Sequence, residues 1–374
     1  MKGSYCYLAV LKARRGQFNA VRGVSPTARS RLAPLFDVLQ PSPRQAADPA
    51  AYLDKVHGHI VSSWAPDRPV HVDARDFPVD YEVAGTSPSA FVSERVAAHG
   101  FKGIPATGTE IERGRDYVHR IGRVAAVLGH GACIRVEREE VVDSTSLKES
   151  LSKTLDLLRI PESQIDLLLD LDFVGRDTPM RLQSIILEAV QTATALGSFR
   201  NIMIAGGSIP EQLGKRDTGV VRREPRVEME AWSQVQSITN YPIAFGDFGV
   251  TNPRYVKPGK AVNVPARIRY TTFQEHVLLR SGRNGHPDLC RQLVEMAEYE
   301  GPSYSAGDQR MKLAARGYAS SGNPAIWVAG DLNHHLEKVS EQAWQVVVQS
   351  GNASRYSLPE PRHYPWLQQE LIEA

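Results

Sequence analysis

The stretch IDLLLDLDF, residues 165–173, is an apolar run that ends in two carboxylates. A run this dense is typical of a parallel strand that is covered on both faces. Alternation along a strand places Asp166, Asp170 and Asp172 on one side and the intervening leucines on the other. Carboxylates at the end of a buried strand cost free energy unless something pairs with them or uses them. We therefore expect a site at this end of the strand.

Seven further stretches read as strands, and most are followed by a helical pattern. They are residues 5–14, 32–40, 69–77, 101–108, 131–139, 199–210 and 241–249. Eight strand–helix units over roughly 250 residues predict a (β/α)8 TIM-like barrel. The alternative is an open doubly wound α/β sheet, but the first turn, KARRG, lacks the Gly-rich pattern of such folds.

The alternation of strand and helix patterns ends near residue 250. Residues 251–272 are rich in Pro, Arg and Lys and predict extended strands or a long loop, and residues 317–331 predict another loop. Helical patterns follow at 287–300, 309–316, 332–349 and 359–372. We expect a barrel domain at residues 1–250 and a C-terminal α+β extension at residues 251–374 that packs on the barrel mouth.

Composition narrows the class of protein. A net charge of +2 over 374 residues argues against binding driven mainly by bulk charge, although a local basic patch is compatible with it. Cys6, Cys133 and Cys290 are far apart, which fits a reducing compartment and argues against a disulfide scaffold or a cysteine-based zinc site. Without a signal-like h-region or an apolar run of membrane-spanning length, we expect a cytoplasmic protein with no membrane partner.

The predicted strand ends carry an unusual number of charged side chains. In a barrel these ends and the loops after them build the active site. The candidate catalytic residues at these ends are Lys12, Asp73, Arg135, Glu137, Asp170 and Asp172. Asp37 and His71 lie on predicted strands as well, and Arg75 is a candidate ligand-binding residue. The alternative is a structural network in which these charges only pair with one another. A divalent metal is a further option, but no HxH or HxxxH spacing accompanies the acids.

A second candidate site is AGGSIP, residues 205–210, together with FGDFG, residues 245–249. Loops after the seventh and eighth strands of a barrel often bind phosphate through backbone N–H groups. Gly206, Gly207, Ser208 and Asp247 are therefore candidate ligand-binding residues. The alternative is an ordinary tight turn.

Two C-terminal segments also contain candidate residues. His334 and His335 are adjacent, so on a helix they point about 100° apart. We expect one to be structural and the other, His334, to reach the site. Residues 254–270 interleave cations and aromatic residues and could track a nucleic-acid backbone, although a solvated charged hairpin is the simpler interpretation. The members of this set are Arg254, Tyr255, Lys257, Lys260, Arg267, Arg269 and Tyr270.

The sequence resembles the bacteriophage-type beta protein family of phages and bacteria. The resemblance runs from YLAVLKARRGQFNAV through VHVDARDF, IDLLLDLDFV and MIAGGSIP to GNPAIWVAGDLNHHLEKVS. The family is functionally uncharacterised, and its bacterial members are associated with phage–host conflict. Its motifs contain Lys12, Arg15, Gly16, Asp73, Asp170, Asp172, Gly207, Asp308, His334 and His335 without assigning them roles.

These observations leave two hypotheses about function. The first is a barrel enzyme, of a hydrolase or phosphodiesterase type, that acts on a phosphorylated or nucleotide-like ligand. The second is a non-catalytic recognition or scaffold subunit of an anti-phage or toxin–antitoxin-like system. That subunit would bind protein or nucleic acid through residues 254–270 and the C-terminal helices.

Overall fold

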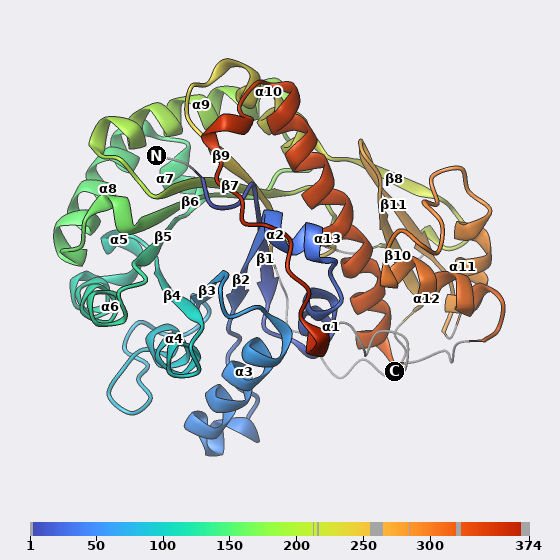
Figure 1. Cartoon of the computed structure of the whole chain (residues 1–374), viewed down its shortest axis with the longest axis horizontal. Helices are drawn as coiled ribbons and strands as arrows, with labels where there is room; N and C mark the ends of the chain where they lie inside the picture. The colour runs from blue at the N-terminus through green and yellow to red at the C-terminus, as the bar shows by residue number, and fades with distance from the viewer. Residues whose placement is uncertain are drawn as a thin grey trace.

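A computed structural model of the chain describes residues 3–211, 213–214, 217–254, 265–283, 285–318 and 323–367. Eight parallel strands form a closed barrel, with β1 hydrogen-bonded to β2 on one side and to β9 on the other (Figure 1). The barrel strands are β1 (Tyr7–Lys12), β2 (Leu32–Asp37), β3 (Pro69–Asp73), β4 (Lys102–Thr107), β5 (Ala132–Val136), β6 (Ile165–Phe173), β7 (Asn201–Gly207) and β9 (Ile243–Asp247). The predicted (β/α)8 fold is confirmed.

Helices surround the barrel, and several begin at a capping residue followed by proline. Ser25, Asp48, Ser87 and Thr178 each accept a hydrogen bond from a backbone N–H of the first turn, and a proline occupies the first helical position. The outer helices are α1 (Arg15–Arg22), α2 (Pro26–Arg31), α3 (Pro49–Ser63), α4 (Pro88–Ala98), α5 (Glu110–Arg113), α6 (Arg115–Leu128), α7 (Arg138–Val141), α8 (Ser144–Leu158), α9 (Pro179–Leu196) and α10 (Val227–Ile238).

The barrel strands have two buried faces. Leu8, Val10, Leu35, Ile104 and Leu168 belong to a small cluster inside the barrel. The alternate residues of the same strands join a much larger cluster beneath the helices. Because both faces are apolar, the polar side chains that point inward are concentrated at the strand ends.

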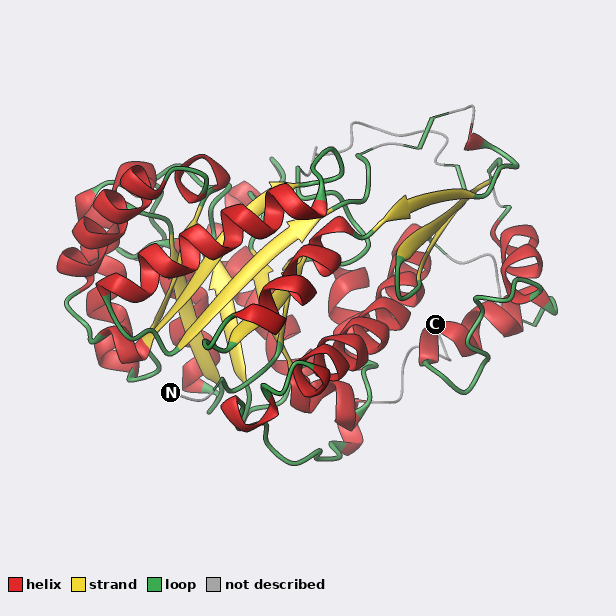
Figure 2. Cartoon of the chain, turned by 90° about the horizontal axis from the view of Figure 1, so that it is seen from above, coloured by secondary structure: helices red, strands yellow, loops and turns green. Residues whose placement is uncertain are grey.

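A second, smaller sheet lies beside the barrel (Figure 2). It is antiparallel in the order β10 (Arg267–Thr271), β11 (Glu275–Arg280), β8 (Arg222–Pro225). One face packs on α11 (His286–Val294) and α12 (Ala306–Ala315) around a separate apolar cluster that includes Ile268 and Leu279. β8 precedes residue 250 and pairs with β11, which follows it, so this sheet draws on both predicted domains. The domain boundary itself stays a prediction.

The long helix α13 (Pro324–Gln349) runs between the barrel and the second sheet (Figures 1 and 2). Asn323 caps its first turn and Pro324 opens it, so the helix starts within the predicted 317–331 loop. Its contact with α1 is close, since a Cβ on Gly16 would lie 2.6 Å from the carbonyl oxygen of Ala325.

The end of the chain returns to the barrel. The backbone N–H of Ser357 donates to the carbonyl of Gly3 at 2.8 Å, and the side chain of Asn352 donates to the backbone carbonyl of Gln236 at 2.7 Å. The predicted helix at 359–372 is wrong for residues 359–364, which are not helical, and residues 365–367 form a single 3-10 turn. The remainder of that prediction lies outside the described residues. Within the described chain, no helix is both long and apolar enough to cross a membrane.

Candidate functional site at the barrel mouth

Arg135 is the centre of a charge network at the C-terminal mouth of the barrel. Its guanidinium donates from Nη1 to Asp37 and Asp73, each at 2.8 Å, and from Nε to Asp170 at 2.8 Å. All four side chains are almost completely buried. These side chains, which we call the floor, come from four different strands, as the alternation in the sequence predicts.

Within the floor, Asp37 is held in its ionised form. Burial alone would raise the pKa of Asp37, but Arg135 and Lys12 outweigh it and hold that pKa well below its usual range. Lys12 Nζ donates to Asp37 Oδ2 at 2.8 Å. The remaining oxygen of Asp73 accepts from the N–H of Ala74 at 2.7 Å. Because the floor carboxylates already accept these hydrogen bonds, the floor is suited to positioning other groups rather than to proton transfer.

Above the floor, a second group of charges reaches solvent, and we call it the rim. It comprises Arg75, Glu137 and Glu112, whose side chains are 30%, 32% and 22% exposed. Arg75 forms ion pairs with Glu137 and, at 3.2 Å, with Asp170 of the floor. Burial, opposed by Arg113 and reinforced by repulsion from Glu137 and Asp73, raises the pKa of Glu112 to about 7.

Glu112 is a rim residue that the sequence analysis missed. It lies in α5, directly after β4, where Thr109 accepts a hydrogen bond from its backbone N–H at 3.4 Å. The Thr-x-x-Glu spacing is that of a capping box, in which the Glu side chain has only a structural role. Its position in the region that follows a barrel strand is the one feature of the sequence that indicates a site residue.

The opposite side of the mouth is covered by residues 248–254. Phe248 joins the interior apolar cluster, and its ring centroid lies 5.9 Å from the guanidinium carbon of Arg135. Arg254 donates to Asp172 at 2.6 Å. Asp172 has a φ of 53° where the β6–β7 register shifts, and its side chain is 29% exposed at the edge of the mouth. The accessible part of the mouth is therefore the side of β3, β4 and β5.

The predicted phosphate-binding turn is occupied by protein atoms. A Cβ on Gly207 would lie 2.9 Å from Pro253, and one on Gly206 would lie 3.2 Å from the side chain of Glu228. Ser208 donates to the carboxylate of Glu228 at 3.2 Å. A carboxylate at this position disfavours an anion, so the arrangement corresponds to the tight-turn alternative.

The chain matches the Beta protein family over residues 7–341. It belongs to that family. No curated protein and no solved structure matches it.

The two histidines of the Beta protein motif do not reach the mouth. His334 is fully buried, stacks on Tyr270 with a centroid distance of 3.8 Å, and bonds Asp308 Oδ2 at 2.8 Å. It therefore ties α13 to α12 and the second sheet. The expectation that His334 enters the site is not matched by its position.

His335 connects this Beta protein's barrel to its extension. Its Nε2 lies 2.9 Å from Asp247 Oδ2, and its Nδ1 lies 2.8 Å from the hydroxyl of Thr271 on β10. Asp247 also accepts from the hydroxyl of Tyr7 at 2.7 Å. Since Tyr7 belongs to the cluster outside the barrel, Asp247 faces α13 and not the mouth, contrary to the sequence prediction.

His71 lies deeper in the barrel than the mouth. Its Nε2 is 2.7 Å from Asp166, which also binds Arg200 through two hydrogen bonds of 2.7 Å. Burial is again outweighed, here by Arg200 and His71, so the pKa of Asp166 is well below its usual range. Asp166 and Asp170 share the inward face of β6 but serve two separate networks.

Most of the described residues of the basic segment, 254–270, contact other parts of the protein. Tyr270 is fully buried, and Arg269 lies against α13, with its Nη1 3.8 Å from Asp331 Oδ2. Arg254 is exposed but paired with Asp172. Tyr255, Lys257 and Lys260 lie outside the described residues.

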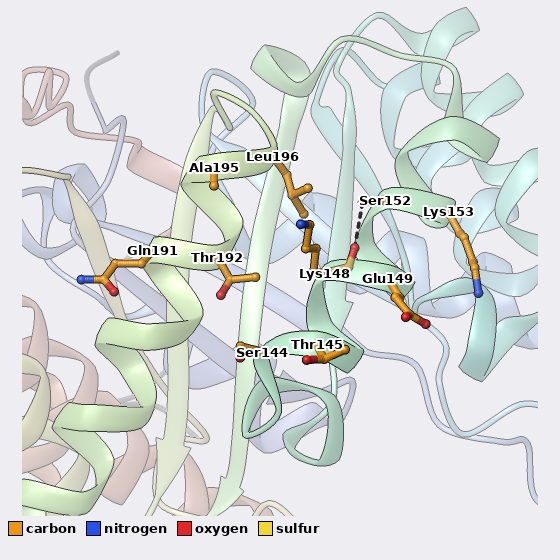
Figure 3. Close-up of a pocket in the computed structure, with 10 residues that line it drawn as sticks. All are labelled: Ser144, Thr145, Lys148, Glu149, Ser152, Lys153, Gln191, Thr192, Ala195 and Leu196. Carbon is orange, nitrogen blue, oxygen red and sulfur yellow. Dashed lines mark hydrogen bonds between the residues drawn. The ribbon is translucent and has the colours of Figure 1, made fainter.

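A groove elsewhere on the surface has no predicted site residue. It lies between α8 and α9, has a volume of about 890 Å³, and is lined by polar side chains such as Lys148 and Gln191 (Figure 3). A hollow of about 470 Å³ lies nearer the rim and is lined by Val79, Tyr117 and Arg113. In the described residues, no three His, Cys, Asp or Glu side chains are arranged to hold a metal ion.

Proposed function

We propose that this Beta protein is an enzyme that performs general acid–base chemistry at the rim of the barrel mouth. The observation that carries the proposal is the combination of Glu112, Arg75 and Glu137 on the accessible side of a buried, fully paired floor. Barrel enzymes place their chemistry at this face.

The rim contains carboxylates in contrasting surroundings. The pKa of Glu112 is raised to about 7, so this group can both release and accept a proton near neutral pH. Glu137 is instead held by the Arg75 guanidinium. Two carboxylates with different environments are a common basis for dividing acid and base roles.

We propose a substrate with a single anionic group, such as a phosphomonoester. Arg75 is the rim cation, and a guanidinium can bind a phosphate through two parallel hydrogen bonds. The acids of the floor and rim outnumber Lys12, Arg75 and Arg135, which disfavours a highly charged ligand. The hollow beside Arg113, which pairs with Glu112 at 3.2 Å, offers room for the rest of the substrate.

The test is depletion of compounds from a bacterial metabolite extract, followed by mass spectrometry. We expect the wild-type protein to consume at least one anionic compound, and Glu112→Gln and Glu137→Gln to lower that rate at least about a hundredfold. Glu149→Gln, an exposed change on α8, is the matched control and should keep the wild-type rate. All four proteins should have similar melting temperatures.

The alternative is a non-catalytic recognition protein, and the coverage of the mouth by residues 248–254 favours it. If the wild-type protein depletes no compound, or if both rim variants keep full activity, the enzyme proposal is wrong. A role in phage–host conflict is an expectation from the family resemblance alone.

A further inference from the structure

A group of arginines on the second sheet has too few counter-charges. Arg267 on β10 is directly opposite Arg280 on β11, and Arg269 follows two residues along the same strand. Residues two apart in a strand share a face, so all three side chains lie on the face opposite the apolar cluster of that sheet. Like charges directly opposite each other in a sheet are destabilising.

The acids near this group do not neutralise it. Among the described residues, Arg267 has no ion-pair partner, and its Nε is buried without a hydrogen bond. Within the part of the chain that the structure describes, Arg280 donates to the Gly214 carbonyl and the Thr218 hydroxyl, and its Nε has no partner. Arg269 has Asp331 at 3.8 Å, which is a long contact for an ion pair.

The state of Asp331 increases the imbalance. This carboxyl is fully buried, and burial raises its pKa to about 8 despite the opposing effect of Arg269. At neutral pH this carboxyl therefore offers Arg269 less negative charge than an ordinary aspartate does. Burial and repulsion from Arg269 and Arg280 lower the pKa of Arg267, which is consistent with three guanidiniums close together.

We propose that Arg267, Arg269 and Arg280 bind a phosphate group of a small phosphorylated molecule. Three guanidiniums on one face supply donors for the several oxygens of a phosphate, and the anion would remove their mutual repulsion. The floor of the mouth, where carboxylates saturate every cation, has no such excess of positive charge. The proposal does not depend on the function proposed for the rim.

Calorimetric titration with inorganic pyrophosphate tests this proposal. We expect saturable binding to the wild-type protein that weakens as NaCl is raised from about 50 to 200 mM. Arg267→Gln and Arg280→Gln should each weaken binding at least about tenfold. Without ligand, both variants should melt no lower than the wild type, because each removes a like-charge repulsion.

Two further variants locate the binding. Arg223→Gln is the matched control, since this arginine is on the same sheet but pairs with Glu275 and Glu298, and it should bind as the wild type does. Arg75→Gln removes the anion contact proposed at the rim, so it should leave intact the binding event that Arg267→Gln and Arg280→Gln weaken. Loss of binding in Arg75→Gln with retention in Arg267→Gln would move the ligand to the mouth and overturn the proposal.

The proposal also fails if the wild type shows no saturable binding, or if all arginine variants weaken binding equally. A single-stranded oligonucleotide provides the last comparison. Tighter binding of the oligonucleotide than of pyrophosphate, lost in the same two variants, would overturn the small-molecule assignment in favour of nucleic acid.

Discussion

Arg135 binds three carboxylates of the floor, so its removal should destabilise the barrel. Arg135→Met would leave three buried carboxylates without the cation that they share. Breaking a buried ion network by removing one partner typically costs about 3–5 kcal/mol. We expect urea unfolding to show a loss of this size, whereas Arg123→Met, an exposed change on α6, should have little effect. A loss below about 1 kcal/mol would contradict this view of the floor.

Glu228 should make stability depend on pH. Burial raises its pKa from 4.5 to about 7 although Arg226 opposes the change, and its Oε2 has no partner among the described residues. A raised carboxyl pKa contributes stability below pH 4.5 that is lost as the pH rises towards 7, by up to about 3 kcal/mol.

We therefore expect the wild type to lose more stability than Glu228→Gln between pH 5 and pH 8. Thermal unfolding of both proteins across this range measures the difference. Glu112 titrates in the same window but is present in both proteins, so its effect cancels. Parallel pH curves would contradict the raised pKa of Glu228.

At the scale of elements, the packing of α13 on α1 depends on Gly16. Gly16→Ala would bring a methyl group against the backbone of Ala325, and overpacking of this kind typically costs about 1–3 kcal/mol. Gly58→Ala in α3 meets no atom within 4 Å and should instead stabilise the protein by up to about 1 kcal/mol. Chemical denaturation of both variants measures whether the free energy of unfolding falls for Gly16→Ala and rises for Gly58→Ala.

The barrel strands were predictable because each combines an apolar run with a clear turn. The missed elements lacked that combination. β8 is the charged sequence RREP, which becomes a strand only through its pairing with β11. α1, RGQFNAVR, has no favourable N-cap, since Arg14 makes no side-chain capping bond. The start of α13 did carry an Asn-Pro signal, which the glycine and serine residues before it obscured.

The candidate site was predictable where strand alternation alone decides the direction of a side chain. That rule correctly places Arg135, Asp73 and Asp170 at the mouth. It gives no direction for Glu112, which lies in a helix. Asp247 could have been placed by its parity with Phe245, but its partner His335 is 88 residues away and no local pattern indicates it.

At the scale of the whole molecule, we expect the barrel and the second sheet to unfold together. His335 bonds Asp247 and Thr271, and residues 352–357 return to the barrel through backbone contacts. Urea unfolding followed by circular dichroism and by tryptophan fluorescence should give coincident single transitions. Two separate transitions would mean that the two parts are thermodynamically independent.

The insertion of β8 between β7 and α10 has a consequence for the order in which the protein matures. When a ribosome has released only the first 250 residues, the barrel strands are all present, but β8 has no partner strand. The two arginines and the glutamate of RREP keep that unpaired edge soluble. Docking of the later β11 then completes the sheet, so the last third of the chain finishes a structure that the first two thirds have already begun.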